Sequence, residues 1–319
     1  DKQIFTKFDK GFFNFSSFGS NDLNNTNNLK SRVINDLNFQ SLDLMTDYGF
    51  KNNYNIYIKN LNTTAKNDSQ YKSSPQVELM SILEFNTSLP MIDENENSIN
   101  YLTPKISLRF NPGDMKNYSD ADRKVSVNNI FEINRLGIDD SFEKGKSLTM
   151  GVDFKKTNIL DINKFFEAKL ATVYREDDEN FIPSKSGIDK KNSNFFGSIS
   201  NNFSEFINVG YDFIIDNDFN TLKYNSLNTT LNFKNLTTEF NFIEENGEFG
   251  DANTIENKTK LKFNDDNYLT FNSRRNRKIS LTEYYDLIYE YKNDCLVAGI
   301  KYNKTYYEDR DLRPSENLL

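Results

Sequence analysis

Stretches in which every second residue is apolar recur along this chain of 319 residues and restrict what it can fold into. Residues 148–155 read LTMGVDFK, and residues 105–110 read KISLRF. Residues 76–89 and 207–215 alternate in the same way. Because successive side chains of a strand point to opposite faces, each stretch has one apolar and one polar face. The pattern predicts an all-β chain, and residues 159–166 are the best of few stretches with a helical period.

Short turns rich in Asn and Asp join several of these stretches. A two-residue turn at 234–235 would pair Phe233 with Leu236 and put both apolar sets on one face. A three-residue loop at 265–267 and a turn at 293–294 would do the same. Longer polar connections are expected at 111–124, 176–194, 244–257 and 274–282.

Tight turns at one end of the strands and long loops at the other are typical of an antiparallel up-and-down transmembrane β-barrel of outer-membrane type. At the strand length that crosses hydrocarbon, residues 1–319 would hold roughly 16–20 strands of one barrel region. The polar faces carry many charged residues, as a water-filled lumen would. Tyrosines gather near strand ends, where an interfacial girdle would lie: residues 284, 285, 289, 291 and 302. A soluble β-sandwich also alternates and stays an alternative.

The composition removes several functions. With no His and one Cys, the chain cannot build histidine-based catalysis, an internal disulfide or a thiolate metal cluster. A net charge of −8 argues against a nucleic-acid partner bound through its phosphates. No run approaches the length of a transmembrane helix. We therefore expect a protein that is not an enzyme and needs no cofactor or metal.

Several strings resemble the LPS-assembly protein family (LptD), the outer-membrane barrels of lipopolysaccharide transport. Each string is degenerate by itself, and their order and spacing from about residue 40 onward carry the resemblance. The strings are LTPKISLRFNP at 102–112, FEINRLG at 131–137, DSFEKG at 140–145, LTMGV at 148–152, YYDLIYEYKNDCL at 284–296 and YYEDR at 306–310.

The resemblance implies a barrel in the outer membrane of a Gram-negative bacterium that inserts lipopolysaccharide into the outer leaflet. The substrate would pass without chemistry through a polar lumen and a lateral seam. The implied partners are lipopolysaccharide, a plug lipoprotein similar to LptE, and a periplasmic lipopolysaccharide bridge. The alternatives are another outer-membrane channel, a porin or receptor barrel, or a secreted carbohydrate-binding or hydrolytic β-protein.

Basic residues of the polar faces and loops are candidate contacts to the phosphates and acidic sugars of such a substrate. For each of them the alternative is an ordinary solvated charge. They are Lys105, Arg109, Lys155, Lys169, Arg274, Arg275, Arg277 and Lys278.

The sequence departs from this family at its ends and in its cysteines. No upstream periplasmic region and no aromatic-ended closing strand are recognisable, so we expect a fragment that cannot close alone. Well-studied members carry two adjacent C-terminal cysteines, whereas Cys295 follows Asp294 here. Its parity, opposite to Leu296, would turn it inward at the short-turn rim, which is periplasmic in this class. The resemblance therefore implies a disulfide to a missing N-terminal cysteine, with a free thiol as the alternative.

Overall fold

The structure is a computed structural model that describes residues 2–8, 10–306 and 315–318. The described residues form one sheet of 19 strands with two single-turn 3-10 helices, and none of the helical segments is long or apolar enough to cross a bilayer. The strands are β1 (Lys2–Phe8), β2 (Gly11–Asn24), β3 (Asn28–Ser41), β4 (Leu44–Met45), β5 (Lys51–Lys66), β6 (Gln76–Ser88), β7 (Met91–Glu94), β8 (Ser98–Asn111), β9 (Gly145–Asn158), β10 (Phe165–Arg175), β11 (Phe195–Ser204), β12 (Ile207–Ile215), β13 (Leu222–Phe233), β14 (Leu236–Glu245), β15 (Asn253–Lys262), β16 (Asn267–Asn276), β17 (Leu281–Lys292), β18 (Val297–Thr305) and β19 (Ser315–Leu318).

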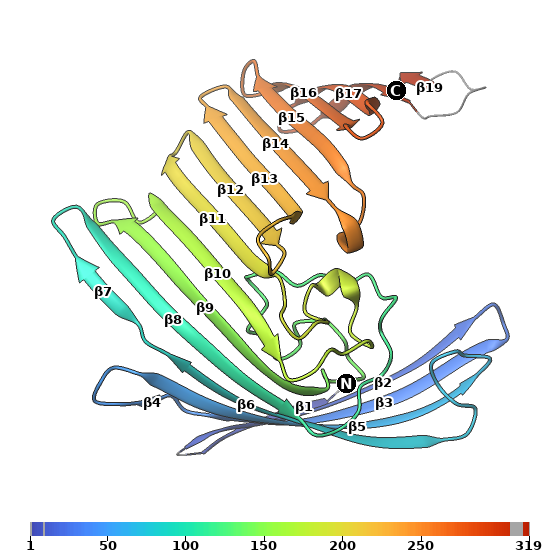
Figure 1. The fold of residues 1–319 in the computed structure, drawn as a ribbon. Coiled ribbons are helices and arrows are strands. Elements are labelled where there is room, and N and C mark those ends of the chain that lie inside the picture. The colour runs from blue at the N-terminus through green and yellow to red at the C-terminus, as the bar shows by residue number, and fades with distance from the viewer. Residues whose placement is uncertain (1, 9, 307–314, 319) are drawn as a thin grey trace. The chain divides into compact units, whose positions relative to one another are not determined.

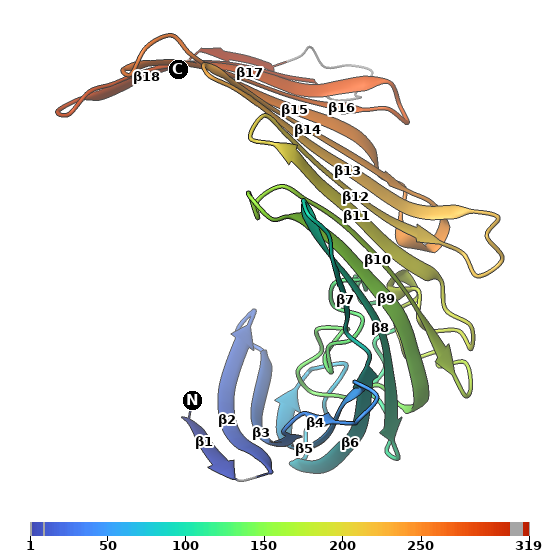
Figure 2. The same cartoon turned by 90° about the vertical axis from the view of Figure 1, so that its left-hand side faces the viewer.

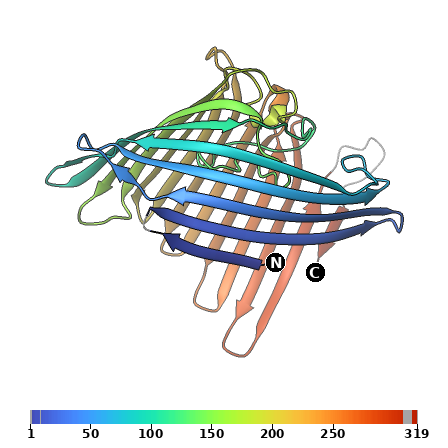
Figure 3. The same ribbon diagram turned by 90° about the horizontal axis from the view of Figure 1, so that it is seen from below.

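Contacts between residues divide the chain into two compact units. Unit 1 holds Asp1–Met91, Thr103–Val152 and Ala171–Ser193, and unit 2 holds the remaining residues. In unit 1, β2 pairs antiparallel with β1 and β3, and β5 pairs antiparallel with β3 and β6 (Figure 2 and Figure 3). In unit 2, β11 to β18 pair in chain order, again antiparallel (Figure 1). The all-β, antiparallel up-and-down fold class is therefore confirmed, and the 19 strands of the described residues fall within the predicted 16–20.

The alternation predicted from the sequence separates two faces of the sheet in unit 1. We call the face that bears Leu83 and Leu108 the outer face and the face that bears Glu84 and Arg109 the inner face. The register of β6 and β8 pairs these residues face by face, because Glu84 lies opposite Arg109. Leu83 and Leu108 are exposed, whereas Glu84 and Arg109 are buried. The polar face of this unit is thus covered rather than open to solvent.

In unit 2 the apolar face is interrupted by three polar residues whose side chains bind one another. Thr238 Oγ1 lies 2.7 Å from Thr259 Oγ1, and the Asn257 amide donates to Thr238 Oγ1 at 3.0 Å. Each polar group on this part of the face therefore has a partner on a neighbouring strand. Apolar residues flank the group along the strands, among them Phe240, Ile255 and Phe271.

The predicted hairpins are present, and two of them turn one residue away from the predicted position. Phe233 pairs with Leu236, as expected. Leu261 pairs with Leu269, which centres the next loop on residues 264–266. Lys292 pairs with Val297 and thereby places residues 294–295 at the tip of the last turn. A shift of the loop by one residue changes each partner by two positions, so the apolar sets still share a face.

The predicted helical period at 159–166 is wrong, because residues 159–164 form a loop and β10 begins at Phe165. Ile159, Leu160 and Ile162 are exposed, so their spacing does not mark a packed helix face. The long connections predicted at 111–124 and 176–194 are present, and the first extends to residue 144. Those predicted at 244–257 and 274–282 are shorter, at residues 246–252 and 277–280, because the adjoining strands continue further.

Gly197 on β11 makes room for an aromatic ring on β12. It pairs with Phe213, and a Cβ at residue 197 would lie 2.1 Å from that ring. We expect Gly197→Ala to lower the unfolding free energy by about 1–3 kcal/mol, because the ring must leave its position. Gly210→Ala on β12 is the matched control, since no atom lies within 4 Å of its Cβ. Urea unfolding in detergent measures both, and equal midpoints would contradict this packing.

Candidate functional site

Two long loops lie on the inner face of unit 1 and are bound to one another. They are the β8–β9 loop, residues 112–144, and the part of the β10–β11 loop that belongs to unit 1, residues 176–193 (Figure 1). The Tyr118 amide donates to the Phe181 carbonyl at 2.9 Å, which joins the two loops. The Lys116 ammonium binds the Glu78 carboxylate of β6 at 2.7 Å, which joins the first loop to the sheet. The two folded loops therefore lie against the polar face of this unit.

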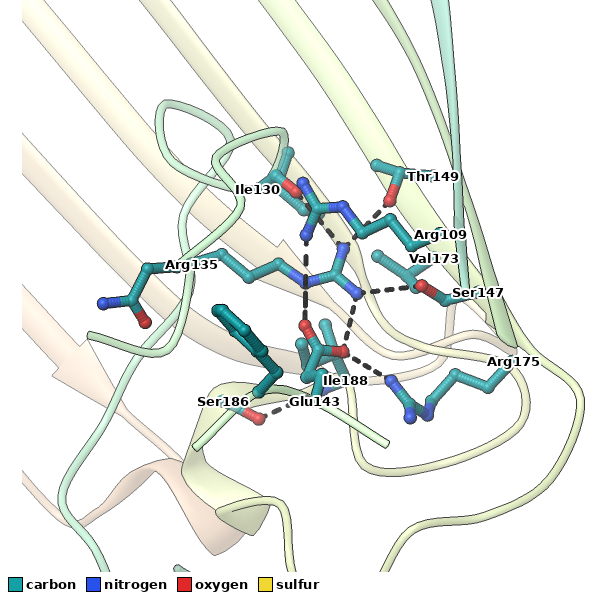
Figure 4. Close-up of polar contacts among 12 residues, drawn as sticks. Arg109, Ile130, Arg135, Glu143, Ser147, Thr149, Val173, Arg175, Ser186 and Ile188 are labelled. Carbon is teal, nitrogen blue, oxygen red and sulfur yellow. Dashed lines mark hydrogen bonds and ion pairs between the residues drawn. The ribbon is translucent and has the colours of Figure 1, made fainter. Parts of the chain in front are cut away.

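Glu143, next to the end of the β8–β9 loop, is the centre of a buried ion cluster (Figure 4). Arg135 of the same loop donates to both of its oxygens, from Nε at 2.6 Å and from Nη2 at 2.8 Å. Arg175, the last residue of β10, donates to Glu143 Oε1 at 2.5 Å. A carboxylate shared by two guanidiniums accepts charge-assisted hydrogen bonds, which are stronger than neutral ones.

The remaining contacts of Arg135 tie the loop to β9. Its Nη1 donates to Thr149 Oγ1 at 2.9 Å and to the Ile130 carbonyl at 3.2 Å, and its Nη2 lies 3.4 Å from Ser147 Oγ (Figure 4). The Arg135 side chain is 0% exposed. A guanidinium without solvent needs such a full set of acceptors, so this residue couples the loop conformation to the sheet.

A third arginine, Arg109 of β8, belongs to the same cluster. Its Nε donates to Glu84 Oε1 at 3.0 Å, and its Nη1 lies 4.0 Å from Glu143 Oε2. Glu84 also accepts from Asn55 Nδ2 at 2.8 Å and from Ser107 Oγ at 3.3 Å. Three guanidiniums thus face two carboxylates, which gives the cluster a formal charge of +1.

Not every donor of the cluster has an acceptor. Arg109 Nη1 and Nη2 and Arg175 Nε are buried and make no hydrogen bond. Buried polar atoms normally have partners, and a buried charge without one costs free energy. The cluster therefore holds more donor capacity than the two oxygens of Glu143 and the two of Glu84 satisfy.

The electrostatic balance favours the ionised form of Glu143. Burial by itself would raise the pKa of this carboxyl, but Arg135, Arg175 and Arg109 together hold its pKa well below the ordinary value of 4.5. A lowered carboxyl pKa contributes stability that is fully present above the ordinary value and is lost as the pH falls through the folded-state value.

We therefore expect the contribution of Glu143 to the unfolding free energy of the loops to be lost as the pH drops below about 4.5. Hydrogen exchange of residues 112–144 across this range measures the effect. The variant Glu143→Gln lacks the titrating group, so its protection should be lower and its dependence on pH flatter. A wild-type protein whose loop protection rises on acidification would contradict this assignment.

A second anchor lies just before Glu143, near the end of the β8–β9 loop. The hydroxyls of Tyr71 and Tyr118 both donate to the carboxyl of Asp140. Burial raises the pKa of Asp140 above its ordinary value. Beside it, Phe142 packs against a small apolar cluster formed by Ile34, Leu61, Ala65, Tyr71 and Met80. The end of the loop is thus fixed both by the ion pairs of Glu143 and by the aromatic and apolar contacts of Asp140 and Phe142.

The basic residues predicted as substrate contacts lie in different surroundings. Arg109 is buried and bound to Glu84, so its guanidinium does not reach the surface. Lys105 lies on the same face of β8, with its ammonium 4.7 Å from the ring centre of Phe131 in the β8–β9 loop. Both therefore contact the folded loop or its anchor, and contact with a substrate stays a prediction.

The other predicted contacts are in unit 2 and do not form one site. The Lys155 ammonium lies 5.1 Å from the ring centre of Phe165, and Lys169 pairs with Glu167 at 3.2 Å. The run at 274–278 is split, because Arg274 and Arg275 point to opposite faces of β16. Arg274 binds Glu256 and Glu283, Arg277 lies over the ring of Phe242, and Lys278 pairs with Asp251.

Cys295 is an exposed free thiol at the tip of the β17–β18 turn. Its predicted place on a strand is wrong because the turn lies one residue later than expected, and its inward orientation stays a prediction. Its amide donates to Asn293 Oδ1 at 3.0 Å. A disulfide to another segment stays a prediction. The matching string at 306–310 lies outside the described residues after Tyr306.

Sequence reasoning missed most of the cluster. Arg135 and Glu143 lie in a loop without strand periodicity, and Arg175, which also binds Glu143, is 32 residues away in the sequence. Two features of the sequence pointed toward the cluster. The alternation of β8 puts Arg109 on the polar face, and the strings at 131–137 and 140–145, which lack strand periodicity, contain Arg135 and Glu143.

Comparisons with known proteins give a limited result. No family model matches the chain, and no curated protein matches it. Among solved structures, the ferric enterobactin receptor PfeA of Pseudomonas aeruginosa (G324V mutant) aligns over 97% of this chain and 59% of its own, at 9% identity and a TM-score of 0.39. The siderophore receptor PirA of Acinetobacter baumannii aligns over 98% and 61%, at 10% identity and a TM-score of 0.40. The chain thus spans about three fifths of these structures, and identities this low transfer no substrate.

Proposed function

We propose that this chain forms part of the wall of a transport barrel in the outer membrane of a Gram-negative bacterium. We further propose that the β8–β9 and β10–β11 loops narrow its lumen. The observation that carries the proposal is the contrast between the two faces in unit 1. Leu83 and Leu108 are exposed on the outer face, whereas the inner face seats polar loops through Arg135 and Glu143. An apolar exterior and a polar, loop-filled interior are the reverse of a soluble globule.

The experiment uses the full-length protein. We expect it to fractionate with the outer membrane, to migrate as a heat-modifiable barrel on gels and to conduct ions in planar bilayers. Replacing residues 113–142 by a short Gly/Ser linker should increase the conductance, because the loop no longer fills the lumen. Recovery in the soluble fraction without detergent would overturn the proposal and favour the secreted carbohydrate-binding alternative.

Insertion of lipopolysaccharide into the outer leaflet is the more specific candidate. It is supported by the order and spacing of the strings that resemble the LPS-assembly family, four of which lie in or beside β8, the β8–β9 loop and β9. Depletion of the protein should then stop lipopolysaccharide from reaching the cell surface. A conducting barrel whose depletion leaves surface lipopolysaccharide unchanged would favour a porin or receptor channel instead.

A further inference from the structure

The arginines around Glu143 carry more N–H donors than form hydrogen bonds with this carboxylate. Arg109 and Arg175 come from the sheet, and Arg135 comes from the loop itself (Figure 4). Arg109 Nη1 and Nη2 and Arg175 Nε have no acceptor, although all three atoms are buried. The two oxygens of Glu143 accept from Arg135 and Arg175, and the nearer one lies 4.0 Å from Arg109 Nη1, beyond hydrogen-bond distance. The idle donors are therefore those that a ligand with more oxygen atoms could engage.

We propose that the arginine cluster is a binding site for a phosphate group, which Glu143 occupies in this structure as an internal substitute. A phosphate entering the site would displace Glu143 from Arg175 and Arg109. Leaving the sheet, Glu143 would carry its partner Arg135 with it and release the β8–β9 loop from β9. The inference rests on the proposed transport function, since it makes the loop respond to a phosphorylated solute.

The side chains of the arginine cluster suit a tetrahedral oxyanion as a ligand. Guanidinium groups bind phosphate through paired N–H donors, and a buried excess of positive charge favours an anion. With Glu143 displaced, Arg109 and Arg175 face Glu84 alone, so the charge of the sheet residues is +1. Hydroxyl donors line the same face at Ser147 Oγ and Thr149 Oγ1, both now contacted by Arg135.

Release of the loop from β9 would also break its other contacts with the sheet. Lys105 stacks on Phe131 of the loop, and Lys116 binds Glu78 of the sheet. Lys105 and Glu78 are the sheet residues that a moving loop must leave. The anchor at Asp140 is separate from the arginine cluster, because it is formed with Tyr71 and Tyr118. We therefore expect phosphate to free the segment around Arg135 from β9 first, while the contacts of Asp140 persist.

The test measures loop mobility in the full-length protein in detergent. A spin label is attached at Glu132→Cys, an exposed loop position, in a Cys295→Ser background. Inorganic phosphate should mobilise the label in a saturable manner, whereas chloride at the same ionic strength should not. A diphosphorylated lipid in mixed micelles, compared with free phosphate, distinguishes a lipid headgroup from a soluble phosphate as the source.

Two variants sharpen the test. Glu143→Gln removes the competing carboxylate, so phosphate should act at about tenfold lower concentration. Arg109→Gln removes one guanidinium of the proposed phosphate site and should abolish the mobilisation of the label by phosphate. The matched control is Glu176→Gln, which removes an exposed carboxylate paired with Lys146 and should behave as wild type.

A wild-type label that neither phosphate source mobilises would overturn the inference, even if Glu143→Gln failed to fold. An unchanged midpoint in a folded Glu143→Gln variant would overturn it as well. The readout needs no bilayer, so a conducting protein whose loop ignores phosphate refutes this inference alone. Lack of conductance together with a phosphate response would refute only the proposed function.

Discussion

Replacing Arg135 by alanine is expected to detach the β8–β9 loop from the inner face of unit 1 and to lower its local stability by about 3–5 kcal/mol. The side chain is 0% exposed and donates to Glu143, Thr149 and the Ile130 carbonyl. Its loss leaves Glu143 with one strong partner fewer and a cavity beside Thr149. Breaking a buried pair by removing one partner is costly because the other charge stays buried.

Hydrogen exchange of residues 112–144 measures this loss of local stability, and heat-modifiability of the barrel checks that the strands still form. Arg123→Ala is the matched control, because Arg123 is an exposed arginine of the same loop and should change the stability by less than about 0.5 kcal/mol. Equal protection of the loop in the two variants would show that the cluster does not hold it.

Placing an arginine on the apolar face should have the second large effect. Leu227 lies in the middle of β13, is 38% exposed and pairs with Tyr211 and Phe242. If this face meets hydrocarbon, Leu227→Arg should lower the unfolding free energy of the protein in lipid vesicles by about 2–4 kcal/mol. In detergent-free water the same exposed position would tolerate the change.

The matched control is the next residue of the same strand. Asn228 points to the other face and pairs with Gly210 and Asn241. Neither partner is charged, and Gly210 has no side chain, so an arginine at position 228 has space and meets no like charge. Asn228→Arg should therefore fold into vesicles nearly as well as wild type. Urea titration of vesicle-inserted protein compares the two, and an equal or larger loss in Asn228→Arg would assign the faces the other way round.

Local rules were enough to predict most of the sheet. Alternation in 105–110 and 148–155 predicted which side chains share a face, because the period of a strand is two and the faces differ in polarity. Turn positions were less certain. At Asp294 and Asp265 several neighbouring polar residues suit a tight turn, so composition left an error of one residue. That error moved Cys295 from a strand to the tip of a turn.

The candidate site could not be read from the sequence to the same extent. Arg135 meets Thr149 and Arg175 meets Glu143 only because β8, β9 and β10 bring their ends together. The loop between β8 and β9 has no period that would show which residues face the sheet. For the same reason the polar face of β8 was expected to meet water, whereas Arg109 is covered by a loop that the alternation does not describe.

The most direct test of the whole account is a cysteine scan of residues 227–233 in a Cys295→Ser background, with a fluorescent label quenched by lipids brominated on their acyl chains. We expect strong quenching at residues 227, 229, 231 and 233 and weak quenching at 228, 230 and 232, because alternate side chains face hydrocarbon. Quenching without a period of two, or with the opposite phase, would contradict an apolar exterior around a polar lumen.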